Sequence, residues 1–382
     1  MSLSSTPLAP GPFKPWVTFA DVARLDISRR RPAPASPSRH LLAAEAWLCR
    51  AQDISTDGGV SYGYTWPRGW RDSYPETSGY IASTFFRLAK VRDPSYLERG
   101  RRIVQWLLSV QNPDGSFANP RYGSQGIVFD TGQVLFGLVS GYLATRDESV
   151  MAAARRAASW LTGIADGNGL WTRNEHLDTP HVYNTRSAWA MLELNALEFD
   201  ATRERVARCN LDWALAEQQP SGFFAHCAFK AGQPPFTHTI AYTARGLLES
   251  GLLLNDRRYL DAATRCADAT LSHLAEDGHL PATLSPSGEA AARTCCLTGN
   301  CQFAIVWLRL GDPANRPSYR SAAARALAYV MSTQDIDTAD EDICGAIKGS
   351  HPVWGRYAPM AFPNWAAKFF VDAMWLQSQQ GR

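Results

Sequence analysis

Residues 111–145 read QNPDGSFANPRYGSQGIVFDTGQVLFGLVSGYLAT, and this stretch contains the unit from which most of the chain is built. Its Asn-Pro-Asp-Gly cluster cannot continue a helix, because proline lacks an amide donor and glycine favours a left-handed stop. A Gly-rich loop follows. Asp130 then offers a side-chain acceptor to the free N–H groups of a second helix. The stretch therefore predicts a helix end, a loop, and a new helix capped by Asp130.

The same unit recurs along the chain and predicts six helical hairpins. Amphipathic segments are expected at 40–52, 95–111, 147–164, 202–219, 256–275 and 317–334. Segments that are apolar on more than one face alternate with them, at 77–90, 130–145, 185–199, 239–254, 299–310 and 364–378. Helices that are apolar all round belong inside a fold. We therefore expect an all-α (α/α)6 toroid, with apolar helices in an inner ring and amphipathic helices in an outer ring.

Two local signals repeat in step with these helices. Most amphipathic segments end in a Gly-containing turn such as Asp166-Gly167, although the sixth, near Asp335, is degenerate. The apolar segments start at polar residues, spaced by about 54 residues at first and by more later. These starts are Glu76, Asp130, Asn184, His238, Thr298 and Asn364. Repeat periods of about 34 or 40–47 residues, typical of tetratricopeptide and HEAT arrays, do not fit this spacing.

Composition narrows the class of protein and its compartment. Hydrophobic residues make up 45% of the 382 residues, enough for a sizeable core, and a net charge of +2 argues against a nucleic-acid partner. No run approaches the ~18 apolar residues of an integral membrane segment, and no signal peptide is evident. The eight cysteines lack an even, secreted-type spacing. We therefore expect reduced thiols and a cytoplasmic location.

The domain organisation is expected to be simple. Residues 1–37 are rich in proline and arginine and predict an arm that packs as a solvated tail on the domain surface. Its run Arg29-Arg30-Arg31-Pro32 leaves open a contact with phosphate or a membrane surface. Residues 38–382 would form the toroid domain.

Several motifs resemble known toroid families. The element Gln-x-x-x-Gly-x-Phe at 111–117 resembles the turn motif of the terpenoid-cyclase and protein-prenyltransferase superfamily. A closer likeness is to bacterial toroid proteins named for polysaccharide biosynthesis in exopolysaccharide gene clusters. It covers about 40–378 and rests on SYPETSGY (73–80), FDTGQ (129–133), VYNTR (182–186), GAIKGS (345–350) and PNWAAKFF (363–370). The resemblance implies a toroid that makes or modifies exopolysaccharide, and it names a pathway but no reaction. Tyr80, Tyr183 and Asn364, which lie within these motifs, are candidate substrate-binding residues.

Two carboxylates at the starts of neighbouring inner helices are candidate catalytic residues. In a ring of hairpins these starts face one mouth, where long loops also gather and helix dipoles favour an anionic ligand. Glu76 follows a proline and is a poor cap, whereas Asp130 is equally explained as a helix cap. As acid and base on a glycosidic bond, the pair predicts a glycoside hydrolase.

A second constellation predicts chemistry at a uronate. Asn184 and Arg186 open the third inner helix, and His238 and Tyr242 lie on one face of the fourth. An amide or arginine that neutralises a uronate carboxylate eases removal of the C5 proton, with His238 and Tyr242 as base and acid. This set is similar to that of (α/α)6 uronate lyases, and a C5-epimerase needs the same first step. The alternative without a catalytic role is that His238 caps the helix or is a hydrogen-bonded core histidine, and that Tyr242 is a packed aromatic residue.

Aromatic and basic residues of the first and last loops are expected to bind the sugar. Trp66 and Trp70 lie in the first loop and Trp354 in the last, and aromatic faces stack on sugar rings. Lys348, flanked by glycines, suits a carboxylate or phosphate group. Loop packing and an ordinary surface lysine are the alternatives.

No cofactor or metal is predicted. Cys295, Cys296, Cys301 and Cys344 include no C-x2-C pair, and His351 lies too close to Asp342-Ile-Cys344 to match the prenyltransferase zinc site. Nucleotide-binding fingerprints are absent. The expected partner is an acidic oligo- or polysaccharide, and the oligomeric state stays open. Two alternatives remain: a non-catalytic glycan-binding or scaffold component of a polysaccharide assembly system, and an isoprenoid-handling toroid enzyme.

Overall fold

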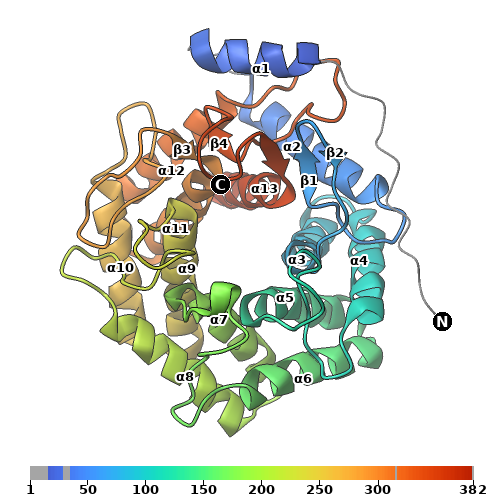
Figure 1. Cartoon of the computed structure of the whole chain (residues 1–382), viewed down its shortest axis with the longest axis vertical. Coiled ribbons are helices and arrows are strands. Elements are labelled where there is room, and N and C mark those ends of the chain that lie inside the picture. The colour runs from blue at the N-terminus through green and yellow to red at the C-terminus, as the bar shows by residue number, and fades with distance from the viewer. Residues whose placement is uncertain (1–15, 29–34, 315, 381–382) are drawn as a thin grey trace.

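Two concentric rings of helices form the body of the molecule, as the sequence predicted (Figure 1). The computed structural model describes residues 16–28, 35–314 and 316–380. The inner ring consists of α3 (Pro75–Val91), α5 (Val128–Thr145), α7 (Thr185–Asn195), α9 (Thr237–Leu254), α11 (Leu297–Ala314) and α13 (Asn364–Gln379). The outer ring consists of α2 (Pro37–Asp53), α4 (Tyr96–Val110), α6 (Glu148–Gly163), α8 (Ala201–Ala216), α10 (Arg257–Leu271) and α12 (Pro317–Met331).

Burial explains which helices lie inside. In α5, residues 128–139 are buried without interruption, whereas α4 buries a single stripe that includes Ile103, Trp106 and Leu107. The uninterrupted run needs apolar neighbours on every side, and the stripe needs them on one side only. Each inner helix contacts the next, and α13 contacts both α11 and α3, so the ring is closed.

Short strands close the ring at its mouth. Strand β1 (Gly63–Thr65) pairs antiparallel with β2 (Gly69–Trp70) and with β5 (Ala361–Pro363), so the first and last loops are neighbours. Strand β3 (Cys295–Cys296) pairs with β4 (Ser350–His351), and two 3-10 turns, η1 (His176–Asp178) and η2 (Val182–Asn184), precede α7. These strands were not predicted, because segments of two or three residues have no periodic pattern to detect.

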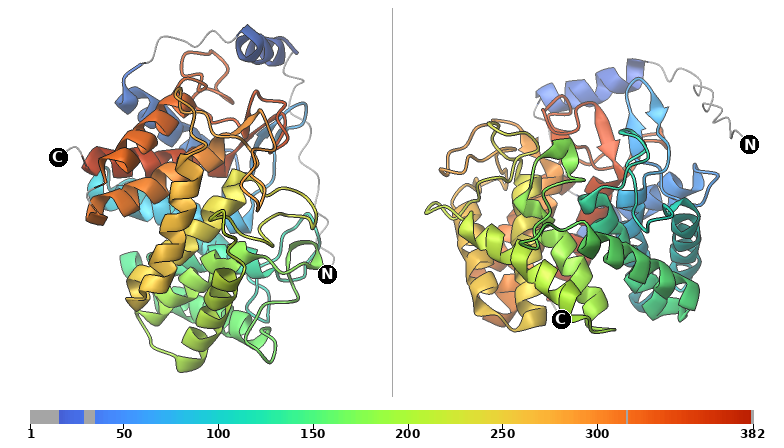
Figure 2. Two further views of the ribbon diagram at one scale, coloured as in Figure 1. Left: turned by 90° about the vertical axis from the view of Figure 1, so that its left-hand side faces the viewer. Right: turned by 60° about the horizontal axis from the view of Figure 1, so that its bottom comes forward.

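The long loops gather at one end of the rings (Figure 2). They are the six connections from outer to inner helices, at 54–74, 111–127, 164–184, 217–236, 272–296 and 332–363. The returns from inner to outer helices are short, for example 146–147 and 255–256. The inner-helix starts that were expected to carry the chemistry therefore lie at this loop-bearing end.

The cap predicted for Asp130 is wrong. Helix α5 begins at Val128, its N-cap is Ile127, and no side chain caps it, so Asp130 lies inside the first turn. Side-chain caps occur on outer helices instead: Asp147 accepts from Ser149 N in α6, and Asp200 accepts from Arg203 N in α8. Without a capping role, the Asp130 carboxyl is available for another function.

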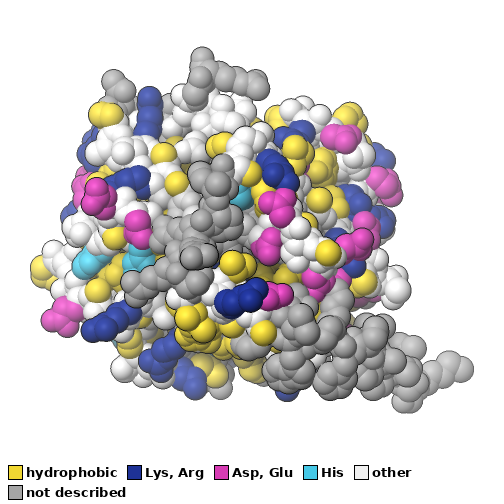
Figure 3. Space-filling model, turned by 90° about the horizontal axis from the view of Figure 1, so that it is seen from above, with side chains coloured by type: hydrophobic (Ala, Val, Ile, Leu, Met, Phe, Trp, Pro, Cys, Tyr) yellow, Lys and Arg dark blue, Asp and Glu magenta, His cyan; other side chains and the backbone are white. Residues whose placement is uncertain are grey.

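The N-terminal arm contributes more than a solvated tail. Residues 16–28 form helix α1, outside the two rings, and the buried Asp26 carboxylate accepts hydrogen bonds from Lys348 Nζ and from Val353 N (2.8 Å). Its Arg29–Pro32 run lies outside the described residues. None of the described helices is long and apolar enough to cross a membrane. On the face shown in Figure 3, acidic and basic side chains are interspersed, in keeping with the small net charge.

Helices α3 and α5 approach so closely that only glycine fits between them. A Cβ on Gly79 would lie 2.5 Å from Val134 Cα and 2.7 Å from Gln133 O, both backbone atoms that cannot rotate away. We expect Gly79→Ala to lower the free energy of unfolding by about 3 kcal/mol, measured by urea denaturation. Gly163→Ala is the matched control, since nothing lies within 4 Å of the added methyl group, and it should leave stability unchanged or raised. Equal midpoints for the two variants would contradict this account.

Candidate functional site

A cavity of about 680 Å³ opens at the loop-bearing end of the inner ring, and every long loop contributes to its wall. Tyr62, Asn119, His176, Phe229, Ala282 and Arg356 represent the six loops in turn. Six of the residues predicted from sequence also line it: Glu76, Tyr80, Asp130, Tyr183, His238 and Tyr242. Residues from both candidate constellations therefore meet in one cavity, although their roles stay predictions.

The two predicted carboxyl groups share one phenol hydroxyl. The hydroxyl of Tyr74 hydrogen-bonds to Asp130 Oδ2 at 3.1 Å and also to the Glu76 carboxyl. Asn119 donates from Nδ2 to the same phenol oxygen at 2.7 Å. A phenol has one proton to donate, so it cannot donate to both carboxylates at once. This arrangement suits a pair in which one carboxyl is protonated and the other ionised.

Burial sets the protonation of this pair. Burial and then the charge of Glu76 raise the pKa of Asp130 well above its usual range. Burial also raises the pKa of Glu76, to about 7, against the opposing effects of the Tyr74 hydrogen bond and of the charges of Arg186 and Arg121. Two nearby carboxyl groups whose environments separate their pKa values are the usual basis of an acid and base pair. Asp130 is the group that keeps its proton, and Glu76 is the one that ionises near neutrality.

His238 is a neutral hydrogen-bond donor in this structure. Gln302 donates from Nε2 to His238 Nδ1 at 2.7 Å, which leaves the ring proton on Nε2. Burial, with a contribution from Arg186, lowers the pKa of His238 to about 3. Burial raises the pKa of Tyr242 well above its usual value, so its hydroxyl stays protonated. With the Nδ1 lone pair occupied, His238 lacks a free acceptor for the C5 proton, which weighs against the predicted base.

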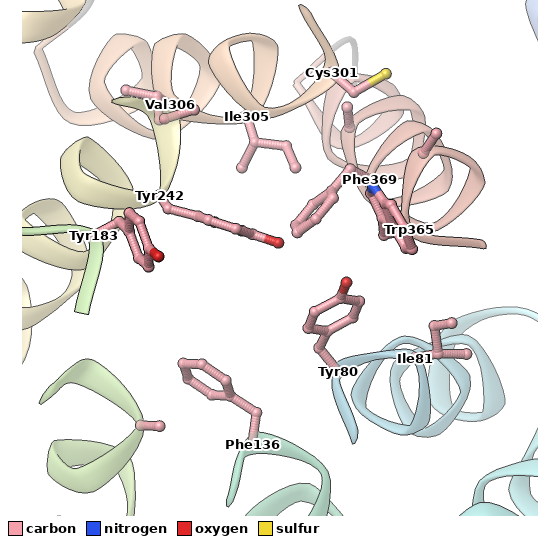
Figure 4. Close-up of a cluster of buried hydrophobic side chains, with 14 of the residues drawn as sticks. Tyr80, Ile81, Phe136, Tyr183, Tyr242, Cys301, Ile305, Val306, Trp365 and Phe369 are labelled. Carbon is pink, nitrogen blue, oxygen red and sulfur yellow. The ribbon is translucent and has the colours of Figure 1, made fainter. Parts of the chain in front are cut away.

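Arg186 lies below the cavity wall as a buried cation surrounded by aromatic rings. Its guanidinium carbon lies 4.9 Å from the ring centroid of Tyr242 and 5.4 Å from that of Phe369, and its Nε donates to Gln133 Oε1 at 2.5 Å. None of the acidic groups in the described residues forms an ion pair with it. Figure 4 shows side chains of this cluster, including those of Tyr80, Phe136, Tyr242 and Phe369, pointing into the centre of the inner ring. Ring faces offset part of the cost of burying such a charge.

Three predicted polar residues have structural partners and are absent from the cavity wall as described. Asn184 donates from Nδ2 to both carboxylate oxygens of Glu175, at 2.6 and 2.7 Å. Lys348 is buried against Asp26 of α1. Asn364 donates to Ser61 O and to Thr77 Oγ1, both at 2.8 Å, and so ties the first loop to α13. Direct contact of these three with substrate is therefore not supported.

The three predicted tryptophans also lie away from the described cavity wall. Trp70 stacks on Trp47 with ring centroids 5.3 Å apart, and Trp66 packs edge-on against Phe362 at 5.2 Å. Trp354 is 44% exposed on the last loop. Tyr357 and Trp365 line the cavity instead. Tyr357 belongs to the last loop and Trp365 to the first turn of α13. A role for the three tryptophans in sugar binding stays a prediction.

Sequence reasoning missed four residues that shape the site: Tyr74, Asn119, Arg121 and Gln302. Tyr74 lies two residues before Glu76, within the SYPETSGY motif (73–80). Its position in that motif could have identified it as a site residue. Gln302 lies four residues after the predicted helix start at Thr298, on the same face of α11. Asn119 and Arg121 lie in an irregular loop whose path only the folded structure reveals.

The cysteines show no arrangement suited to a metal. No group of three or more histidine, cysteine or acidic side chains in the described chain is placed to hold a metal ion. Cys295, Cys296 and Cys301 are buried, and burial raises the pKa of Cys296 to about 12. Such thiols behave as small apolar groups.

Comparison with known proteins identifies the architecture. The family model described as the squalene-hopene cyclase C-terminal domain matches residues 74–247. The solved unsaturated glucuronyl hydrolase of Bacillus sp. GL1 superposes with a TM-score of 0.72 at 15% identity, over 91% of this chain and 97% of its own. The chain is an α/α toroid.

Two further toroids have similar structures. The cellobiose 2-epimerase of Bacillus thermoamylovorans gives a TM-score of 0.68 at 12% identity, over 94% of this chain and 99% of that one. An unsaturated glucuronyl hydrolase of Streptococcus agalactiae gives 0.69 at 11% identity, over 97% and 96%. No curated protein matches the sequence significantly. At these identities the superpositions establish the shared toroid fold only. Any reaction has to be inferred from the residues that line the cavity.

Proposed function

We propose that the toroid is a carbohydrate-processing enzyme that hydrolyses a glycosidic bond in an acidic oligosaccharide. The observation that carries this proposal is the Glu76 and Asp130 pair, bridged by the Tyr74 hydroxyl in an aromatic-lined cavity. Asp130 would protonate the departing glycosidic oxygen, and Glu76 would accept a proton from the attacking water. His238 and Tyr242 would donate hydrogen bonds to sugar oxygens.

The structural neighbours support a saccharide as the ligand. Two of them are unsaturated glucuronyl hydrolases, and a mutant form of the Streptococcus agalactiae protein was solved in complex with dGlcA-GalNAc6S. Tyr62, Tyr183, Phe236, Tyr357 and Trp365 give the cavity of this chain ring faces on which sugars can stack. Its size also suits a ligand of a few sugar units.

Lyase or epimerase chemistry at a uronate is the close alternative. The presence of a cellobiose 2-epimerase among the structural neighbours supports considering it. It requires a base near C5. The predicted base, His238, accepts from Gln302 through Nδ1 and holds its proton on Nε2. Glu76 would have to act as the base instead, and Asp130 would then have no role in the reaction. Hydrolysis uses both carboxyl groups, which is why we prefer it.

An isoprenoid-handling toroid is a second candidate. It is favoured by the match to a squalene-hopene cyclase domain and by the aromatic cluster around Tyr80, Tyr242 and Phe369. A buried, permanently charged Arg186 amid that cluster suits polar ligands better than a hydrocarbon chain. We therefore keep an acidic oligosaccharide as the proposed ligand.

The biological setting belongs to the same proposal. The motifs shared with exopolysaccharide-cluster toroids support a role in making or modifying exopolysaccharide. A cytoplasmic location is supported by the eight cysteines, all of which are free thiols in the described chain.

The test is to follow the products from a trisaccharide that carries glucuronate between two glucose units. In H₂¹⁸O we expect cleavage with one ¹⁸O on the newly released anomeric carbon, read by mass spectrometry. Deuterium at C5 without cleavage would identify an epimerase, and an unsaturated product a lyase. Binding without any product would favour the non-catalytic glycan-binding alternative.

A further inference from the structure

We propose that Arg121, stacked on Tyr62, selects an acidic sugar by pairing with the carboxylate of the unit that lies beside Glu76 and Asp130. This inference rests on the proposed function and deepens it, because it names the residue that sets the substrate class. Arg121 was not among the residues predicted from sequence.

The guanidinium of Arg121 is held ready for a planar anion. Its central carbon lies 3.5 Å from the ring centroid of Tyr62. Tyr62 is itself fixed by Trp365, whose ring centroid lies 4.6 Å away in an edge-on contact. The Tyr62 hydroxyl also accepts a hydrogen bond from the Arg121 guanidinium. A guanidinium has five N–H donors, so those that remain can bind a carboxylate. No acidic side chain of the described chain forms an ion pair with Arg121, although it lines the cavity.

One amide positions both this arginine and the carboxyl pair. Asn119 donates from Nδ2 to the Tyr74 hydroxyl at 2.7 Å, and its Oδ1 accepts from the backbone N–H of Arg121 at 3.1 Å. The bridge between Glu76 and Asp130 is therefore tied to the loop that presents Arg121. The charge of Arg121 also acts on Glu76, lowering its pKa against burial. A carboxylate bound by Arg121 would thus belong to a sugar at the point of cleavage and not to a distant unit.

The charge balance of the cavity points to the same class of ligand. Lys230 and Arg356 also line the cavity and form no ion pair with the acids that the structure describes. Glu76 and Asp130 are the acidic groups of the described lining, and burial drives both toward the protonated form. Arg121, Lys230 and Arg356 form no ion pair within the described chain, so they give the cavity an excess of positive charge, which favours an anionic ligand.

The experiment measures binding by calorimetry in an Asp130→Asn background, so that the sugar stays intact. The acidic glucose–glucuronate–glucose trisaccharide is compared with cellotriose, which lacks the carboxylate. We expect the acidic sugar to bind more tightly by about tenfold to a hundredfold, the range for charge-assisted hydrogen bonds. Arg121→Gln should bring this ratio close to one, because it should weaken binding of the acidic sugar far more than that of cellotriose, and Arg121→Lys should restore part of the ratio.

The control is Arg101→Gln, which removes an exposed arginine from α4 on the outer ring and should preserve the ratio. An unchanged ratio in Arg121→Gln would overturn the inference while leaving the proposed hydrolysis intact. If Arg121 confers selective binding but the wild type incorporates no ¹⁸O, the inference on binding would be supported and the proposed hydrolysis would be contradicted. Failure of both sugars to bind would overturn both.

Discussion

The Asp130→Asn variant is expected to lose about 10³-fold in kcat on the acidic trisaccharide while folding normally. The amide keeps the shape of the carboxyl group, and its Nδ2 can donate to the Tyr74 oxygen, 3.1 Å from the native Oδ2, as the protonated carboxyl does. It cannot protonate a departing oxygen. Product release followed by chromatography measures the loss.

Stability separates this loss from misfolding. Because the pKa of Asp130 is raised in the folded state, the folded protein holds a proton that the unfolded chain releases above about pH 4. Stability therefore falls as pH rises through that range, and at pH 7 the asparagine variant should be at least as stable as the wild type. Asp261→Asn, on the exposed face of α10, should change neither kcat nor stability. An active Asp130→Asn enzyme would remove Asp130 from the mechanism.

The Glu76→Gln variant is expected to lose about 10²- to 10³-fold in kcat/KM and also the acid limb of the pH profile. In the wild type, activity should rise as Glu76 ionises, with a midpoint near its pKa of about 7, and fall at higher pH when Asp130 loses its proton. Glutamine does not titrate, so the lower midpoint should vanish from its residual activity. Rates measured from pH 5 to pH 9 at constant ionic strength decide this.

The same group predicts a pH effect on unfolding. The folded pKa of Glu76 lies above the usual 4.5, so the folded state binds the extra proton and loses stability as pH rises from about 4.5 to about 7. Glu76→Gln should reduce that slope. A wild-type midpoint near 4.5 in both activity and unfolding would show that Glu76 is not held in the environment described.

The ring architecture was predictable because it depends on periodic patterns. The uninterrupted burial of α5 and the single buried stripe of α4 both leave a signature in the sequence, and the ordered succession of such helices leaves few ways to cover every apolar face. Helix α1 was missed because it is a single helix within a proline- and arginine-rich segment. Its anchoring residue, Asp26, meets Lys348 from the far end of the chain.

The site was predictable at helix starts and unpredictable elsewhere. Glu76, Asp130 and His238 share the periodic position that brings them to one mouth, so spacing alone identified them. Asn184 has the same spacing, but the partner that occupies it, Glu175, comes from a preceding irregular loop. Arg121 was not found for a similar reason, since its place over Tyr62 depends on how two loops fold against each other.

The pairing of β1 with β5 has a consequence for biosynthesis. Tyr64 faces Phe362 across this ladder, and the residues between these partners span nearly the whole toroid. During translation, the early hairpins can pack against one another as they emerge from the ribosome. The cavity wall nevertheless stays incomplete until α13 has emerged and Trp365 packs against Tyr62. Joining ends so far apart in sequence carries a large loop-closure entropy and makes this the slow, late event of maturation. A nascent chain therefore completes the wall of this cavity only after residues 361–365 have been added.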